Sequence, residues 1–145
     1  MQKHLMITYL RRITRKVNTA SMRVFLIISL GAILGANCRY WVGGWAAERF
    51  GTAFPYGNLI INLSGSFLLG LFMTLVTGRF LVDPQWRIFV TIGFLGSYTT
   101  FSSYTYESVN LILSGQVWQG VFNLFGSSFL GGLAVLLGIW LGRLV

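Results

Sequence analysis

The chain has 145 residues, of which 54% are hydrophobic and only 10% are charged. A soluble domain carries about 25% charged residues, so this composition excludes an ordinary water-soluble protein and indicates a chain solvated mostly by lipid. The net charge of +8 does not predict nucleic-acid binding, because much of it lies in an N-terminal tail beside apolar segments, where basic residues typically contact anionic lipid headgroups.

Residues 1–22 form this predicted basic tail, and residues 23–145 form a predicted transmembrane domain. Five of the eleven basic residues lie in the tail's first 21 positions: Lys3, Arg11, Arg12, Arg15 and Lys16. Two interpretations of the tail stay open. It is a disordered segment of the native protein, or the native start is Met22, from which Arg23 leads directly into the first apolar segment.

Four apolar segments of roughly 20 residues, the length that a bilayer requires, follow the tail. The first runs from about Val24 to Trp41, and the second from about Tyr56 to Gly78. The third runs from about Trp86 to Leu113, and the fourth from about Trp118 to Leu141. The sequence therefore predicts an all-α integral membrane protein with four transmembrane helices. Their connections are short, so consecutive helices should be antiparallel neighbours.

Small residues recur four positions apart, a spacing that lets helix backbones approach closely. The pairs are Gly31 and Gly35, Ser66 and Gly70, Ser127 and Gly131, and Gly138 and Gly142. For any single pair, packing within one bundle is the favoured interpretation. Four helices nevertheless make a thin bundle, and two copies would enclose a polar path more easily, so we expect an oligomer.

Arg39 ends the first span, and two interpretations of it stay open. Its side chain can snorkel to the lipid headgroups, which is the simpler interpretation. It can also set a positive potential at the entrance of an anion path.

The second span carries a polar face. Asn58, Asn62 and Ser66 are four residues apart, so they share one side of the helix. Carboxamide NH2 groups and hydroxyls can donate hydrogen bonds to an anion. They can equally form interhelical hydrogen bonds, worth about 0.6 kcal/mol each in membranes. This face alone does not decide between the two interpretations.

The third span is the most informative segment, because glycines, hydroxyls and a carboxylate interrupt it at membrane depth. Phe101, Tyr104 and Glu107 are three residues apart and line up along one side. Aromatic ring edges carry weak positive charge and can face an anion without holding it too tightly, although a plain packing stripe is the alternative. Between Gly96 and Thr100 the helix can unwind and free carbonyls for a cation. Hydroxyls and freed backbone groups need partners, so the segment should face helices or water.

The fourth span repeats the polar spacing with Asn123 and Ser127. Nothing in the sequence predicts an enzyme, since His4, the only histidine, lies in the tail and no His, Asp or Glu cluster has metal-ligand spacing. Glu107 is the only acid within a predicted span, and therefore the only candidate for proton coupling.

Several motifs together resemble the small fluoride channels of the CrcB or Fluc family. The resemblance covers about Arg23 to Leu144, and its motifs are Gly31-Ala32 through Arg39-Tyr40, Gly57-Asn58-Leu59-Ile60-Ile61-Asn62-Leu63-Ser64-Gly65-Ser66-Phe67, Gly93-Phe94-Leu95-Gly96 and Thr99-Thr100-Phe101-Ser102. It implies a passive, fluoride-selective channel of the bacterial inner membrane that exports cytoplasmic fluoride. It also implies a third helix broken near its middle and a homodimer whose two subunits insert in opposite orientations.

The resemblance also implies roles for single residues. Phe101, Asn62 and Ser127 match pore-lining positions, and Tyr104 stands where a second phenylalanine is common. Gly96 and Thr99 match positions whose backbone carbonyls, from both subunits, hold a structural sodium ion. Two departures from the family pattern are Ser97, where a second glycine is usual, and Asn123, where tyrosine is often found. Asn58 adds a further amide to the predicted anion path.

Two rival functions predict different behaviour. A small dual-topology exporter of cationic compounds, driven by protons through Glu107, predicts pH-coupled and saturable transport. A purely structural subunit predicts no flux. A channel predicts electrogenic fluoride flux without a proton gradient.

Overall fold

The computed structural model describes the backbone of residues 2–145 and the side chains of residues 21–145. Every regular element in the described chain is helical. Three helical stretches are long and apolar enough to cross a membrane, by length and composition: Ser21–Phe50, Tyr56–Gly78 and Val117–Leu144. The prediction of an all-helical chain compatible with an integral membrane protein is confirmed. The side chains of the predicted basic tail lie almost entirely outside the described residues.

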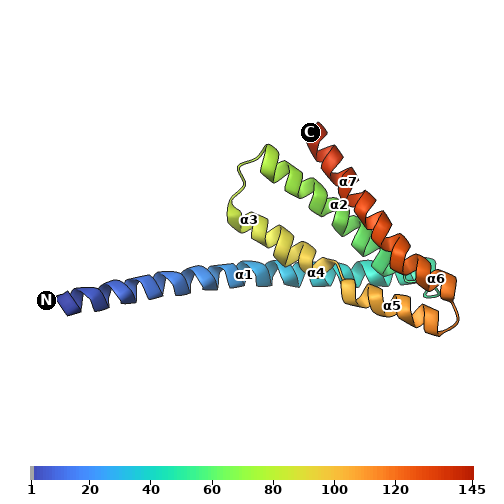
Figure 1. Ribbon diagram of the computed structural model, residues 1–145, viewed down its shortest axis with the longest axis horizontal. Coiled ribbons are helices and arrows are strands. Elements are labelled where there is room, and N and C mark those ends of the chain that lie inside the picture. Colours follow the sequence, from blue (N-terminus) through green and yellow to red (C-terminus); the bar gives the residue numbers. More distant parts are fainter. Residues whose placement is uncertain (1) are drawn as a thin grey trace.

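The long first helix, α1 (Gln2–Phe50), crosses the other helices (Figure 1). It continues nine residues past Trp41, the predicted end of the first span, because Gly43 and Gly44 do not interrupt it. It ends before Gly51, whose φ of 78° is a backbone conformation that glycine adopts readily. The next helix, α2 (Tyr56–Gly78), has the bounds that hydropathy predicts.

The predicted third segment is divided into four helical pieces. They are α3 (Pro84–Ile88), the π-helical segment η1 (Phe89–Leu95), α4 (Gly96–Tyr98) and α5 (Phe101–Leu113). Asp83 caps the start of α3 by accepting a hydrogen bond from the Gln85 N–H, at 2.7 Å. Between α4 and α5, Thr99 and Thr100 have extended backbones. The helical path is therefore interrupted in the middle of this segment.

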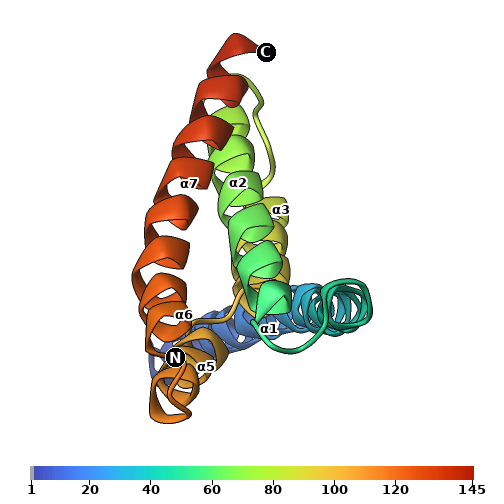
Figure 2. The same cartoon turned by 90° about the vertical axis from the view of Figure 1, so that its right-hand side faces the viewer.

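The last helical stretch consists of α6 (Val117–Val121), π-helical η2 (Phe122–Gly126) and α7 (Ser127–Leu144). Helices α2 and α7 lie side by side (Figure 2). Glycines permit this close approach: a Cβ atom built on Gly138 would lie 2.3 Å from the Phe67 carbonyl oxygen, and one on Gly70 2.4 Å from the Val135 carbonyl oxygen. The small-residue pattern thus corresponds here to packing within one chain.

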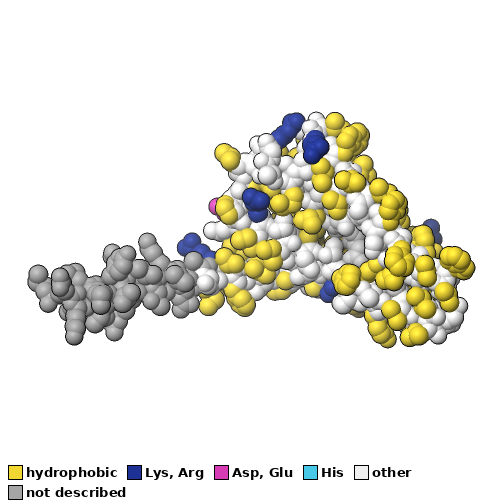
Figure 3. Space-filling model, in the orientation of Figure 1, with side chains coloured by type: hydrophobic (Ala, Val, Ile, Leu, Met, Phe, Trp, Pro, Cys, Tyr) yellow, Lys and Arg dark blue, Asp and Glu magenta, His cyan; other side chains and the backbone are white. Residues whose placement is uncertain are grey.

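Helix α1 packs in the same way against η1 and α4. Gly31 and Gly35 lie against the backbone of residues 89–98. Ile61, Leu95 and Tyr98 form the buried core where α1, α2 and this stretch meet. Outside that core, hydrophobic side chains are spread over the whole described part of the face in view, with few charged ones among them (Figure 3). Apolar surface of this extent is typical of a protein that faces lipid.

Candidate functional site

The interruption between α4 and α5 is held by the side chain of Asn62 on α2. Its Nδ2 donates to the Thr100 carbonyl at 3.0 Å, and its Oδ1 accepts from the Thr100 N–H at 2.9 Å. The Thr100 hydroxyl in turn caps α5 by accepting from the Ser103 N–H at 3.3 Å. One amide therefore satisfies both backbone groups of a buried, non-helical residue, as apolar surroundings require.

This arrangement frees two carbonyl groups. In a continuous α-helix the Thr100 N–H would bond the Gly96 carbonyl, and the Ser103 N–H would bond the Thr99 carbonyl. Here both N–H groups are directed to side-chain oxygens instead. The Gly96 and Thr99 carbonyls thus lose their helical partners. Two carbonyl oxygens beside a helix interruption suit a hard cation, because such oxygens coordinate Na⁺ in broken membrane helices.

A cavity of about 450 Å³ lies beside the interruption, between α2, α4, the start of α5 and α7. Six predicted site residues line it: Asn62, Gly96, Thr99, Phe101, Tyr104 and Ser127. Ser66 and Gly131, which belong to two of the four small-residue pairs, also line it. The structure therefore brings together residues of the second, third and fourth apolar segments. The spacing of polar residues could only assign them to separate helix faces.

Two aromatic side chains of α5 border this cavity in different ways. Phe101 is 78% exposed in the single chain, whereas Tyr104 is 7% exposed. Their ring centroids are 5.8 Å apart with the planes tilted by 55°. The Tyr104 hydroxyl donates to the Leu124 carbonyl and lies 2.7 Å from the Ser128 Oγ. The two rings therefore lie next to each other, one held by hydrogen bonds and one open at the surface.

A buried hydrogen-bond chain connects α5 to the start of α7. The Ser127 hydroxyl donates to Asn123 Oδ1 at 3.1 Å, and Asn123 Nδ2 donates to the Ser108 Oγ at 2.8 Å. The Ser108 hydroxyl then donates to the Tyr104 carbonyl at 2.7 Å. Asn123 is only 1% exposed, so it serves as a link between helices and does not line the cavity.

The remaining predicted residues lie around a different cavity, of about 600 Å³, near the start of α2. Arg39, Asn58 and Glu107 all line it. Asn58 Nδ2 donates to Glu107 Oε2 at 2.5 Å. Asn58 and Asn62 thus border different cavities although they are one helical turn apart on α2.

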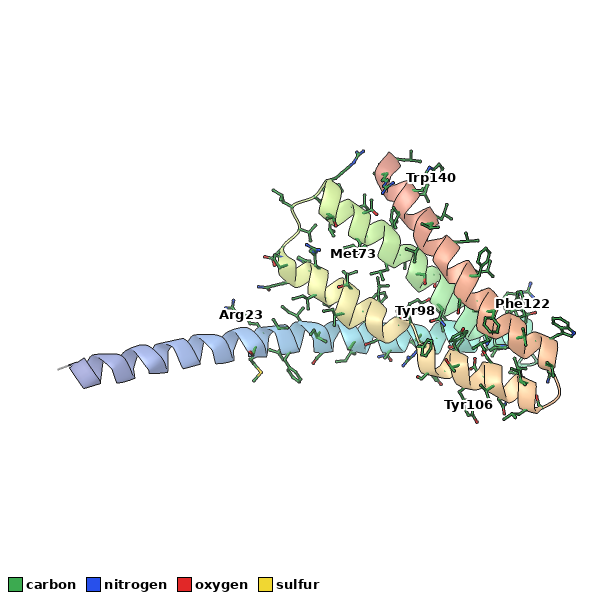
Figure 4. The ribbon with its side chains drawn as sticks, viewed as in Figure 1. Arg23, Met73, Tyr98, Tyr106, Phe122 and Trp140 are labelled. Atoms are coloured by element: carbon green, nitrogen blue, oxygen red, sulfur yellow. The ribbon has the colours of Figure 1, made fainter. Side chains whose placement is uncertain are left out.

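Sequence reasoning missed three hydroxyl-bearing residues of this region. Ser108 and Ser128 were not singled out, and the Tyr98 hydroxyl, which lies 2.9 Å from the Ser64 Oγ, was not predicted. Tyr98 lies where α1 passes α4, next to the interruption (Figure 4). The four-residue spacing of Ser108 from Tyr104 was the available signal, and it is common to many packed helices.

Three long apolar helices, an interrupted helix and a polar cavity define the class: a multi-pass helical membrane protein. The chain belongs to the family described as CrcB-like protein, Camphor Resistance (CrcB), whose sequence profile matches residues 26–139. That match confirms the resemblance drawn from the sequence motifs. With the bacterial relatives described next, it identifies the chain as a multi-pass bacterial membrane protein.

Several curated relatives are similar over almost their whole length. A protein of Sulfurihydrogenibium sp. (strain YO3AOP1) is 44% identical over 127 residues, which is 86% of this chain and 100% of the relative. One from Synechococcus sp. (strain JA-2-3B'a(2-13)) is 47% identical over 86% of this chain and 95% of its own length. A third, from Chloroflexus aurantiacus (strain ATCC 29366 / DSM 635 / J-10-fl), is 46% identical over 84% and 97%. All three are named fluoride-specific ion channel FluC, and ion channels are a non-enzymatic class.

Proposed function

We propose that this protein is a fluoride-selective passive channel that lets the cell release cytoplasmic fluoride. The observation that carries the proposal is the cavity beside the α4–α5 interruption, in which Asn62, Ser127 and two aromatic rings converge. The names of relatives at 44–47% identity support the same function. Proton-driven export of cations has no comparable support, since its only candidate acid, Glu107, lines the other cavity.

The chemistry of the cavity suits a small, strongly hydrated anion. Such an ion crosses only if closely spaced donors replace its water, and each must be weak enough for the ion to leave. Amide and hydroxyl groups supply hydrogen-bond donors, and ring edges supply weak positive charge. Asn62 uses one amide hydrogen on Thr100, which leaves its second hydrogen for the anion. The Ser127 hydroxyl has to rotate away from Asn123 to donate into the cavity.

The proposal includes a fourth membrane span with a break, formed by α3 to α5, and an antiparallel homodimer. Exposure of Phe101 beside the polar cavity supports the dimer, because a second copy would cover that ring and close the path. The two freed carbonyls support a structural sodium ion between the copies. Gly96 and Thr99 of one chain supply only two oxygens, fewer than a hard cation usually takes, and a second chain would double them.

The second cavity is the proposed approach to the anion path, and it is lined by Arg39, Asn58 and Glu107. Arg39 borders the second cavity, and its positive charge would attract anions toward the entrance. The hydrogen bond from Asn58 would hold the Glu107 carboxylate in place. Asn123 is assigned a supporting role, because its amide is used by Ser108 and Ser127.

Expression in a bacterial strain without its own fluoride export tests the function. We expect the protein to restore growth in fluoride-containing medium and to leave sensitivity to cationic dyes unchanged. A Phe101→Ile variant, expressed at the same level, is expected to give no protection. Resistance to cationic dyes without resistance to fluoride would contradict the proposal and favour the exporter.

A further inference from the structure

Resting on the proposed function, we infer that Tyr104 is a positioning residue whose hydroxyl fixes its ring at the anion path and does not itself contact the anion. Tyr104 lines the cavity beside the α4–α5 interruption, yet it is 7% exposed and its hydroxyl is directed at η2. These contacts form a tether that joins α5 to η2 through the Leu124 carbonyl and to α7 through the Ser128 hydroxyl.

A count of hydrogens carries the inference. The Tyr104 and Ser128 hydroxyls bring one hydrogen each, and three contacts connect them with the Leu124 carbonyl. These are Tyr104 to Leu124, Tyr104 to Ser128 at 2.7 Å, and Ser128 to Leu124 at 3.0 Å. Any assignment that satisfies two of the contacts uses both hydrogens. Tyr104 can therefore donate to an anion only by giving up a hydrogen bond within this group.

The tether has a structural consequence on each side. On the α5 side it prevents the Tyr104 side chain from swinging away about its Cα–Cβ bond, so that the ring centroid stays 5.8 Å from that of Phe101. On the other side it holds Leu124 in the middle of the π-helical segment η2. Widened turns of this kind are frequent at functional sites. Because Tyr104 holds the π-helical segment η2 beside the cavity, it also fixes the start of α7, where Ser127 lies.

Three variants test this tether: Tyr104→Phe, Ser128→Ala and the double substitution. The matched controls are Tyr106→Phe, on the same helix as Tyr104, and Ser114→Ala, whose hydroxyl donates to the Leu111 carbonyl at the end of α5. Tyr106 is 72% exposed and points away from the bundle (Figure 4). The readout is the ratio of fluoride to chloride efflux from proteoliposomes. Phenylalanine is common at this position in the family, but in this chain the ring is held through its hydroxyl. We therefore expect Tyr104→Phe to lower this ratio about tenfold, which corresponds to ~1.4 kcal/mol, and both controls to leave it unchanged.

Ser128→Ala distinguishes a tether from a direct anion contact. A tether predicts that this substitution also lowers the ratio, and that the double variant is no worse than Tyr104→Phe. If the Tyr104 hydroxyl binds the anion, Ser128→Ala leaves it free to do so. In that case fluoride efflux stays the same or rises while Tyr104→Phe lowers it, and this result would overturn the inference. A ratio unchanged by Tyr104→Phe would overturn it as well.

The unfolding temperature in detergent separates this inference from the proposed function. Coupled hydroxyls should give non-additive losses, so that the double variant unfolds at a higher temperature than the sum of the single losses predicts. If the unsubstituted protein carried no fluoride, the proposed function would fail. The comparison of the single and double variants by unfolding temperature would still test whether the tether exists. Strictly additive losses would contradict the tether.

Discussion

Side chains around the cavity beside the α4–α5 interruption are of two kinds. Some form hydrogen bonds to the backbone, and others are exposed at the cavity. Asn62, Thr100 and Tyr104 direct polar groups at backbone atoms of the interruption or of η2. Phe101 is largely exposed beside them. The first group sets the shape of the cavity, and in the proposed channel the exposed ring would present its edge to the passing anion.

Replacing Phe101 with isoleucine tests the role of the exposed ring. We expect fluoride efflux to fall to the background of protein-free liposomes, because isoleucine has no positive ring edge. Phe129→Ile is the matched control, since Phe129 is 68% exposed on α7. Normal efflux from the Phe101 variant would remove the aromatic ring from the proposed mechanism.

Replacing Asn62 with alanine tests the clamp on the interruption. The substitution leaves the buried N–H and C=O of Thr100 without the partners described above, and an unsatisfied buried group costs about 1–3 kcal/mol. We expect a loss of roughly 2 kcal/mol in unfolding free energy, measured by denaturant titration in detergent micelles. Asn37→Ala serves as the control, because Asn37 is exposed and donates to the Ile33 carbonyl one turn earlier on its own helix. Equal effects of the two substitutions would contradict the clamp.

At the scale of helices, the close contact between α2 and α7 depends on glycine. Gly138→Ala would place a methyl group 2.3 Å from the Phe67 carbonyl oxygen, a backbone atom that cannot move alone. We expect a clear fall in the unfolding temperature. A Cβ on Gly132, also on α7, meets nothing within 4 Å, so Gly132→Ala should be neutral or stabilising. A Gly138 variant as stable as the Gly132 variant would show that the two helices can move apart at little cost.

The helices themselves were largely predictable, because hydropathy and breakers act locally. The bounds of α2 agree with the prediction, and the turn at Gly115, with a φ of 87°, falls in the predicted loop before the fourth segment. The end of α1 was not predictable, since Gly43 and Gly44 resemble a stop signal but continue the helix. Helical propensity at two positions is weak compared with packing of the whole helix.

The residues that line each cavity were only partly predictable from the sequence. Spacing correctly groups Asn58 with Asn62 on one face of α2, yet they border different cavities. Asn123 and Ser108 form a buried pair, a contact that depends on how α5 and the start of the last helical stretch are rotated. The separation in sequence gives no information on that rotation. Sites formed between helices therefore need the tertiary structure.

At the scale of the whole molecule, sodium dependence tests the proposed cation site. We expect replacement of sodium by N-methyl-D-glucamine to lower the unfolding temperature and to release monomers in light scattering. A ligand at 100 times its dissociation constant stabilises by about 2.7 kcal/mol, which sets the scale of the effect. Replacing chloride by gluconate at constant sodium is the control. Equal stability in both cations would contradict the site formed by the Gly96 and Thr99 carbonyls.

The most direct test of the central claim is fluoride efflux from proteoliposomes that hold the purified protein in a potassium fluoride solution that also contains sodium. The measurement uses a fluoride electrode, begins on addition of valinomycin, and is repeated with chloride. The account predicts rapid fluoride efflux that needs valinomycin, is independent of a pH gradient, and has no chloride counterpart. Equal efflux of both halides, efflux that requires a proton gradient, or no efflux would contradict it.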